Sequence, residues 1–445
     1  MPSFGKLYKS VYRQQNLVES WEVVKQNGLQ SKSDTTKQQI RDFELVAKSR
    51  IKKLHEQLKK KAFTFSMSRG VPIRREGKDD RPLVVSPVEN RIVQRAILNV
   101  LQRKEHGIFR LVNNGTSFGG IEEKSVSDAL KLVAKKTQAG AKFFARSDIK
   151  SFFTKIPKPE VMEIIKDSLK VKDEQFEALL ELAIKVELDN LDSLGSKASL
   201  FPLDDTGVAQ GSCLSPLLGN IFLKEFDVLS NSPDVTCIRF VDDYVILGPD
   251  EKSVKSKFLA GKKWLNDRGL DVYDPFTSGD KGEFGPIHIG FEFLGCDVYP
   301  GRISPSTKGV DKFKEKISLK IKDAFRSNNP LTLAEVLVGL KNTVLGWGNS
   351  YQFCNDRGLI EKLDGWLIEE IGRFHEEYLQ KLSENPCKAA LISKLGVATL
   401  SSCKSNPIYG KKKTGKGKGK PLAPPISVGV LGVQVTANNS KQGAG

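Results

Sequence analysis

The sequence of 445 residues predicts an α+β fold, and three observations support that class. Short apolar runs lie in the middle of the chain, at residues 141–148, 236–240 and 244–247. Amphipathic helical stretches alternate with these runs. Further helical stretches occupy both ends, so the strands are expected to form a core between helical regions.

The first hundred residues are expected to be largely helical. The spacing of apolar residues predicts helices over 8–30 and 36–61, the second with a heavily basic face. Residues 62–87 are predicted to be extended, with a turn at residues 77–80. A further amphipathic helix is predicted over 89–104.

The middle of the chain carries the predicted strands. Two helices are expected within residues 158–188, and a third over 212–229, after a loop-like segment at 207–215. The two later apolar runs flank Val241-Asp242-Asp243 in the pattern of a tight β-hairpin. The run at 141–148 is predicted to be a buried strand that ends at Asp148.

The remainder of the chain is predicted to contain a helix, a second hairpin, a helical region and a tail. The helix spans 253–268, and the hairpin spans 291–303 with Pro300-Gly301 at its turn. Residues 308–383 are helical by apolar spacing. From residue 404 the composition shifts to Lys, Gly and Pro, which predicts a mostly disordered basic tail.

Charge is distributed unevenly along the chain. The formal net charge is +17, with +13 in residues 1–110 and +7 in residues 411–445, which leaves −3 between them. Basic regions on either side of a slightly acidic middle suit a polyanion such as nucleic acid. Solvated, lysine-rich helix faces are the default explanation for the charge alone.

Composition argues against several other classes of protein. No apolar run reaches the roughly 18 residues of a membrane helix, and the first residues lack the apolar stretch of a signal peptide. The six cysteines and four histidines are scattered without a CxxC pair, which argues against a structural zinc site. A reduced, cytoplasmic protein without membrane contact is expected.

Three carboxylates are candidates for catalysis. Asp148 ends a buried strand, and Asp242-Asp243 occupies a hairpin tip after another apolar run. Carboxylates next to apolar strands are costly unless something compensates their charge, and carboxylate oxygens are ligands that Mg²⁺ prefers. Two such ions about 4 Å apart clamp the attacking and leaving oxygens of phosphoryl transfer. Ordinary turn chemistry is the alternative for an Asp-Asp pair, and it is retained for Asp79-Asp80 and Asp204-Asp205.

A glycine-flanked glutamine lies between the carboxylate segments. Gly207 and Gly211 stand on either side of Gln210 and would let the backbone approach a flat, bulky partner closely. The glutamine amide offers both a donor and an acceptor. A plain loop leading into a helix capped by Ser212 is the alternative.

These segments belong to an ordered series of motifs. The series resembles reverse transcriptases, most closely the bacterial branch similar to group II intron-encoded enzymes, and most of all its stand-alone, defence-associated members. The resemblance covers residues 8–375. Its motifs are, in order, Arg81-Pro82-Leu83, Arg91-Ile92-Val93-Gln94, Ser117-Phe118-Gly119-Gly120-Ile121, Asp148-Ile149-Lys150-Ser151-Phe152-Phe153, Gln210-Gly211 with Ser215-Pro216-Leu217-Leu218-Gly219-Asn220, Arg239-Phe240-Val241-Asp242-Asp243, and Phe293-Leu294-Gly295.

The resemblance implies a right-hand polymerase. Its parts would be fingers at 1–130, a palm at 131–305, a helical thumb at 306–385, and a linker and tail at 386–445. It implies metal ligation by Asp148, the Ile149 carbonyl, Asp242 and Asp243, which are also the catalytic carboxylates. The ions would be two Mg²⁺, with Mn²⁺ as a substitute.

The resemblance also implies roles in substrate binding. Nucleotide binding would fall to Lys78, Arg81, Phe153 and Gln210, with the Phe153 ring under the sugar of the incoming nucleotide and excluding a 2′-hydroxyl. The primer grip would be Phe293, Leu294 and Gly295. Arg91 matches a finger position, and a structural role is an equal alternative. Nonspecific contacts to nucleic acid are expected from the tail lysines Lys411, Lys412, Lys413, Lys416, Lys418 and Lys420.

The sequence departs from the family pattern in four places. Phe240 replaces a tyrosine, and Phe276 stands where the family has a lysine associated with the pyrophosphate leaving group. Lys281 follows a few residues later, and no general acid is assigned. Residues after 385 offer no paired cysteines and histidines like those of the family's endonuclease, and a Lys-Gly tail replaces its DNA-binding extension.

The expected activity is RNA-directed DNA polymerisation, a nucleotidyltransferase reaction. Its partners would be dNTPs, a DNA product and an RNA template, expected to be a dedicated non-coding RNA in bacterial antiviral defence. An oligomer or an accessory protein is left open. The alternatives are a maturase-like RNA-binding protein, a group II intron mobility protein without an endonuclease, and an RNA-copying RNA polymerase, against which Phe153 argues.

Overall fold

The computed structural model describes residues 6–75, 77–103, 107–169, 172–277, 281–325, 332–384 and 395. The tail and its six candidate lysines lie outside these residues. The elements below all belong to one unit, Met1–Pro386. Among the described residues, no helix combines the length and the apolar character needed to cross a bilayer.

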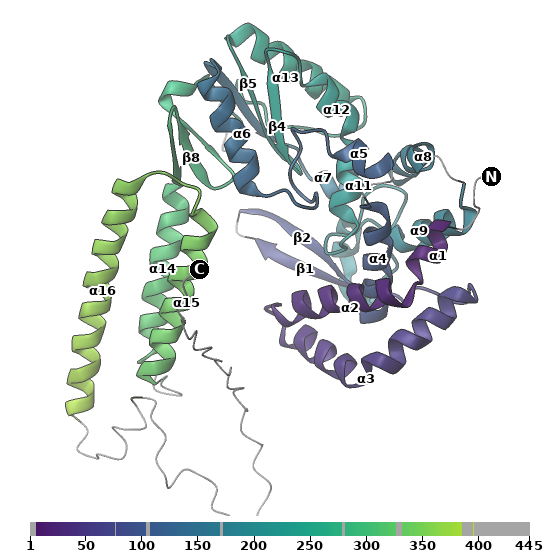
Figure 1. Ribbon diagram of the computed structural model, residues 1–445, viewed down its shortest axis with the longest axis horizontal. Helices are drawn as coiled ribbons and strands as arrows, with labels where there is room; N and C mark the ends of the chain where they lie inside the picture. The colour runs from purple at the N-terminus through teal and green to yellow at the C-terminus, as the bar shows by residue number, and fades with distance from the viewer. Residues whose placement is uncertain are drawn as a thin grey trace, which may run out of the picture. The chain divides into compact units, whose positions relative to one another are not determined.

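Helices and one hairpin build the N-terminal region (Figure 1). Helix α2 packs against both α3 and α4, and the antiparallel hairpin β1–β2 confirms the predicted extended segment. The turn predicted over 77–80 is wrong in its bounds, because Gly77 is in the turn and residues 78–80, with Asp79-Asp80, already belong to β2. The elements are α1 (Lys6–Val11), α2 (Gln14–Leu29), α3 (Asp34–Lys59), β1 (Arg69–Arg75), β2 (Lys78–Val85), α4 (Val88–Leu101) and α5 (Gly107–Val112).

The helix predicted over residues 8–30 is wrong in one respect, because the chain breaks between α1 and α2. Arg13 is extended there, with φ −54° and ψ 129°. The side-chain amide of Asn16 donates to the carbonyls of Ser10 and Val11, at 3.1 Å each. The amide thus satisfies carbonyls at the end of α1 that a continuous helix would bond itself.

A four-stranded antiparallel sheet forms the centre, with strand order β4-β5-β3-β6. Its strands are β3 (Phe143–Asp148), β4 (Thr236–Phe240), β5 (Asp243–Gly248) and β6 (Glu283–Pro286). Alternate residues of each strand face opposite sides. Phe144 and Val245 share a buried cluster with helix α6 (Val126–Gln138), whereas Ala145 and Ile246 belong to the larger core with α13 (Glu251–Asn266). The boundary expected near residue 130 falls within α6.

A series of short helices connects β3 to β4 along the chain. They are α7 (Phe152–Lys155), α8 (Lys158–Leu169), α9 (Glu174–Ile184), α10 (Leu191–Leu194), the 3₁₀ turn η1 (Gly195–Leu200), α11 (Ser215–Phe222) and α12 (Lys224–Leu229). The single helix expected over 212–229 is thus two helices. The first begins at Ser215 with Leu214 as N-cap, so Ser212 is not the cap; its Oγ accepts from the Leu214 N–H at 3.3 Å.

A second sheet and three helices complete the described fold. The sheet is an antiparallel meander of β7 (Phe291–Phe293), β8 (Cys296–Tyr299) and β9 (Arg302–Pro305), preceded by the turn η2 (Ile287–Ile289). The hairpin expected over 291–303 therefore has one strand more than predicted. The helices are α14 (Thr307–Asp323), α15 (Leu333–Tyr351) and α16 (Arg357–Ser383). The Trp347 ring of α15 stacks on the Phe313 ring of α14, with 4.6 Å between the ring centroids, so it takes part in the packing of these two helices.

Candidate active site

The central sheet brings the three candidate carboxylates together. Asp148, the last residue of β3, lies directly opposite Asp243, the first residue of β5, in the antiparallel register. The backbone N–H of Ile149 donates to the carbonyl of Asp242 at 3.1 Å. Two segments about a hundred residues apart in the sequence thus place three acidic side chains at one end of the sheet.

The turn between β4 and β5 has an unusual backbone. Val241 has φ +62°, in the left-handed region that β-branched residues rarely adopt. Gly119 makes room for this turn, because a Cβ at residue 119 would lie 2.7 Å from the backbone nitrogen of Val241. Gly119 of the motif at residues 117–121 is therefore required, because a larger residue would collide with the Val241 backbone.

Two of the carboxylates carry a strong electrostatic penalty. Burial and the neighbouring Asp148 carboxylate raise the pKa of Asp242 from 3.8 to about 6, against the opposing charges of Lys281 and Arg81. The same two causes raise the pKa of Asp243 to about 7, against the opposing charge of Arg146. Such a cluster of carboxylates favours any cation that can enter it.

Lys281 supplies one positive charge to this cluster. Its ammonium forms an ion pair with the Asp148 carboxylate and lies 4.8 Å from the centre of the Tyr273 ring. The sequence drew attention to Lys281 without assigning it a role. The structure places it in direct contact with a candidate metal ligand.

Two of the candidate nucleotide-binding residues are in contact. Arg81 of β2 donates through Nε to the Oε1 of Gln210 at 2.6 Å. The Gln210 carbonyl also accepts from the Val84 N–H at 2.7 Å. Gly211 permits this approach, since a Cβ there would lie 2.7 Å from the Val84 carbonyl oxygen. The glycine-flanked loop therefore packs closely on β2, and the side chain of Lys78 lies outside the described residues.

The two adjacent phenylalanines after Asp148 differ in burial. Phe152 is 2% exposed and belongs to the core, whereas Phe153 is half-buried. The carbonyl of Phe153 accepts from the Val208 N–H at 2.7 Å, which ties this turn to the loop carrying Gln210. Of the two rings, only that of Phe153 is therefore partly exposed. Its role in sugar selection stays a prediction.

The candidate primer-grip residues form the turn between β7 and β8. Phe293 is fully buried, while Leu294 and Gly295 have φ +52° and +75°. The carbonyl of Gly295 accepts from the Ser306 N–H at 2.9 Å, just before α14. Phe293 and Leu294 pack in the same apolar cluster as Phe240, which lies two residues before Asp242, and the role of this turn as a primer grip stays a prediction.

The carboxylates have the donor chemistry of a divalent-metal site. Hard, negatively charged oxygen ligands suit Mg²⁺, and Asp148, Asp242 and Asp243 provide them. Within the described part of the chain, no three His, Cys, Asp or Glu side chains already stand in a metal-binding arrangement. Asp148 is paired with the Lys281 ammonium instead. The three carboxylates therefore suit Mg²⁺ by their chemistry, while Lys281 is paired with one of them, Asp148.

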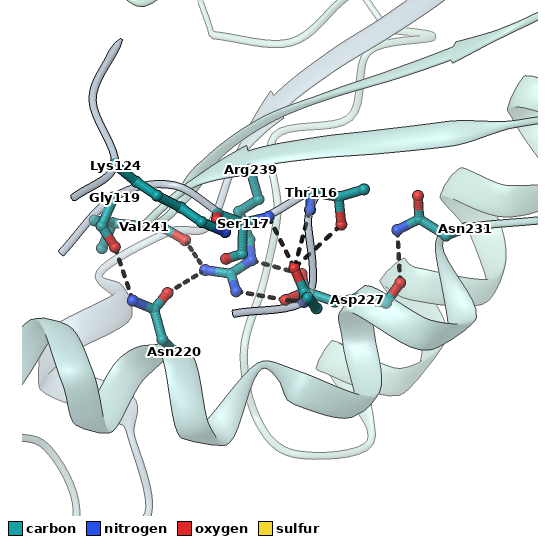
Figure 2. A network of polar contacts seen from close by, with 10 residues as sticks. Thr116, Ser117, Gly119, Lys124, Asn220, Asp227, Asn231, Arg239 and Val241 are labelled. Atoms are coloured by element: carbon teal, nitrogen blue, oxygen red, sulfur yellow. Dashed lines mark hydrogen bonds and ion pairs between the residues drawn. The ribbon is translucent and has the colours of Figure 1, made fainter. Parts of the chain in front are cut away.

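A polar network to which the sequence analysis gave no role supports this site; Arg239 and Asn220 belong to the quoted motifs, whereas Asp227 does not. Arg239, Asp227 and Asn220 form a buried network next to Val241 (Figure 2). The sequence signal that could have revealed this network is Arg239 itself, a charged residue inside the otherwise apolar strand 236–240. Arg146 of β3 is a second such residue, and it forms an ion pair with Glu283 at 3.7 Å.

Comparison with known proteins identifies two segments of the chain. Residues 73–275 match the family model described as reverse transcriptase (RNA-dependent DNA polymerase). Residues 314–378 match the model described as group II intron, maturase-specific domain. The first segment contains all three carboxylates, and the second covers most of α14, α15 and α16.

Individual proteins are similar over part of their length. The group II intron-encoded protein LtrA of Lactococcus lactis subsp. cremoris is 28% identical over 227 residues, which are 50% of this chain and 35% of LtrA. An uncharacterized 91 kDa protein in the cob intron of Schizosaccharomyces pombe is 28% identical over 177 residues, 40% of this chain and 20% of that protein. The matched region thus spans about a fifth to a third of these relatives.

A solved structure of a partial Cas6-RT-Cas1–Cas2 complex is also similar, with 20% identity, a TM-score of 0.33, and coverage of 57% of this chain and 42% of that one. The family matches rest on sequence and agree with the position of the carboxylates. The chain therefore contains a reverse transcriptase domain over residues 73–275, followed over residues 314–378 by a maturase-specific domain of the group II intron kind.

Proposed function

We propose that this protein is an RNA-directed DNA polymerase of the group II intron reverse transcriptase and maturase kind, with the right-hand organisation of fingers, palm and thumb. One observation carries the proposal. Asp148, Asp242 and Asp243 converge at the end of a buried sheet, within the segment matched by the reverse transcriptase model. A surface that only bound RNA would gain nothing from a cluster of repelling carboxylates, because they also repel phosphates.

In this proposal, Asp148 and Asp242 would hold two Mg²⁺, or Mn²⁺, with the Ile149 carbonyl and Asp243 beside them. Bound there, the ions would neutralise the charge on the primer 3′-oxygen and on the pyrophosphate leaving group. Asp242 and Asp243, with pKa values of about 6 and 7, must lose their protons before they can ligate. Lys281 must release Asp148 for the same reason.

The incoming dNTP would lie against the surface that β2 and the 207–215 loop form together. Arg81 bonds Gln210 through Nε alone, and further donors of its exposed guanidinium can reach triphosphate oxygens. Lys78 belongs to the same strand. The half-buried ring of Phe153 would lie under the sugar, and Gln210 beside the templating base pair. The turn at residues 293–295 would contact the primer.

The proposed partners are an RNA template, a DNA product and dNTPs, with the tail lysines adding nonspecific phosphate contacts. The finer proposal is that the template is a dedicated non-coding RNA and that the product serves antiviral defence. It rests on the family resemblance. Challenge with phage of cells expressing the wild type or Asp242→Asn tests it: protection is expected only from the wild type, and equal survival contradicts the defence role.

The match of residues 314–378 to the maturase-specific domain favours a second candidate, an RNA-binding maturase whose polymerase activity is incidental. Primer extension on an RNA template with Mg²⁺ and dNTPs separates the two, with RNA binding measured in parallel. The polymerase proposal predicts extension by the wild type and none by Asp242→Asn at unchanged RNA affinity. RNA binding without extension by the wild type would favour the maturase.

A further inference from the structure

A buried arginine lies two residues before the Val241-Asp242 turn. Arg239 is fully buried, and its guanidinium makes four hydrogen bonds (Figure 2). Nε and Nη2 donate to the two carboxylate oxygens of Asp227, at 2.7 and 2.6 Å. Nη1 donates to the Oδ1 of Asn220 and to the carbonyl of Val241, both at 2.8 Å. The arginine therefore reaches the residue that directly precedes Asp242.

The same network holds the opposite side of the turn. Asn220 donates through Nδ2 to the carbonyl of Gly119 at 2.7 Å, and Gly119 packs on the backbone of Val241. The Val241 carbonyl thus accepts a hydrogen bond from Arg239, and Gly119 lies close against the Val241 nitrogen on the other side. These contacts hold a left-handed valine that would otherwise relax, since such a conformation persists only where the surroundings over-determine it.

Further bonds fix the arginine itself. Asp227 also accepts from Asn114 at 2.8 Å, and Asn114 in turn accepts from the backbone of the following turn. The backbone of Arg239 pairs with the 116–118 segment on both sides: its N–H donates to the Thr116 carbonyl, and its carbonyl accepts from the Phe118 N–H, both at 2.9 Å. The network thus joins β4, α11, α12 and the 114–119 segment around one turn.

Stability alone does not explain this arrangement. A buried ion pair often contributes no more than well-packed apolar side chains of similar volume, because both charges lose their hydration. Here the ion pair between Arg239 and Asp227 is fully formed. The Nη1 of Arg239, which takes no part in that pair, donates to the turn that carries the candidate metal ligand Asp242. The bond from Arg239 to the Val241 carbonyl is the link that an apolar replacement would lose.

We propose that Arg239, fixed by Asp227 and Asn220, is a positioning residue that sets the Val241 turn and so aims the Asp242 carboxylate at a divalent cation shared with Asp148. The inference rests on the proposed polymerase function and adds to it a residue that does not touch substrate. Groups that orient a metal ligand are typically worth about 10- to 100-fold in metal affinity or activity when removed.

The test uses the full-length protein and two changes. Arg239→Lys keeps the charge opposite Asp227 but cannot reach Asp227, Asn220 and Val241 together. Arg239→Met combined with Asp227→Leu removes both charges of the ion pair, so that no buried charge is left without a partner. Arg268→Lys is the matched control, because Arg268 pairs with Glu160 and Glu225 on α8 and α12, and no described contact joins it to the turn.

Mn²⁺ binding is measured from the electron paramagnetic resonance signal of the free ion. Binding that the wild type shows and Asp242→Asn lacks is assigned to the carboxylate site. Both Arg239 variants are expected to bind Mn²⁺ about 10-fold or more weakly, and to need correspondingly more Mg²⁺ for half-maximal primer extension. Thermal unfolding of the double variant should stay close to wild type, and Arg268→Lys should bind Mn²⁺ normally.

Wild-type Mn²⁺ affinity in both Arg239 variants would overturn the positioning role, even if thermal stability fell. Equal weakening in Arg268→Lys would overturn it as well, because the effect would then be general. Failure of the underlying function looks different: the wild type itself would not extend a primer, whatever the Arg239 variants do.

Discussion

Neutralising one of the candidate metal ligands should make the metal-free protein more stable. Asp243 lies opposite Asp148 in the sheet, and its pKa is raised from 3.8 to about 7, chiefly by burial and by that neighbour. At about 1.4 kcal/mol for each pKa unit, the charged form is penalised by about 4 kcal/mol above neutral pH. Asp243→Asn removes the charge at nearly constant volume.

The gain is smaller than this penalty, because the asparagine amide also costs free energy to bury. A net stabilisation of about 1–3 kcal/mol remains, which corresponds to a rise in Tm of about 1–4 °C at pH 8. For a carboxyl whose pKa is raised on folding, the folded state binds more protons than the unfolded state between about pH 4 and 7. Wild-type stability therefore falls as pH rises through this window. The advantage of Asp243→Asn should be largest at pH 8 and should shrink towards pH 5.

The assay is thermal unfolding in EDTA at pH 5 and pH 8. Asp192→Asn, a change at an exposed aspartate of α10, is the control and should not alter Tm at either pH. Added Mg²⁺ should raise the Tm of the wild type more than that of Asp243→Asn. A variant equal to or less stable than wild type at pH 8 would refute the electrostatic account of this site.

Two further predictions concern neighbouring residues. Phe153→Val should raise incorporation of rNTPs relative to dNTPs by roughly 5- to 150-fold, as expected if the ring edge excludes a 2′-hydroxyl at a cost of about 1–3 kcal/mol; an unchanged ratio of single-nucleotide incorporation efficiencies removes Phe153 from the sugar site. Lys281→Met should tighten Mn²⁺ binding in the free-ion resonance assay, because Asp148 then has no competing ammonium; weaker binding would mean that Lys281 supports the site instead of competing for it.

The sequence predicted the parts of the fold that depend on local pattern. The runs that became β3, β4 and β5 are short and mostly apolar, and β4 and β5 are buried almost throughout, so both the strands and the carboxylates at their ends were predictable. The predicted hairpin included residues 291–293, but the turn that makes them a separate strand was missed: it lies at Leu294 and Gly295, and Leu294, at φ +52°, is an unusual turn residue. The break after α1 depends on the Asn16 side chain, which no helical periodicity records.

The site was predictable only where a motif marks it. Asp148 and Asp242 follow from their positions at strand ends, whereas the contact between Arg81 and Gln210 joins residues 129 apart in sequence. The side-chain partners of Arg239 lie on other elements, Asp227 at 12 and Asn220 at 19 residues along the chain, and Asp227 is itself bonded by Asn114, 113 residues away. Such contacts depend on tertiary packing, and one sequence does not specify them.

The central claim is that the carboxylates at the end of the sheet catalyse DNA synthesis on RNA. The most direct test is single-nucleotide incorporation into a primer annealed to RNA, with Mg²⁺ and one dNTP, by wild type, Asp148→Asn and Asp204→Asn. Asp204 belongs to the exposed pair assigned to turn chemistry. Incorporation by the wild type and Asp204→Asn, with a loss of at least about 1,000-fold in Asp148→Asn, is the predicted result. Incorporation by Asp148→Asn at the wild-type rate would contradict the account.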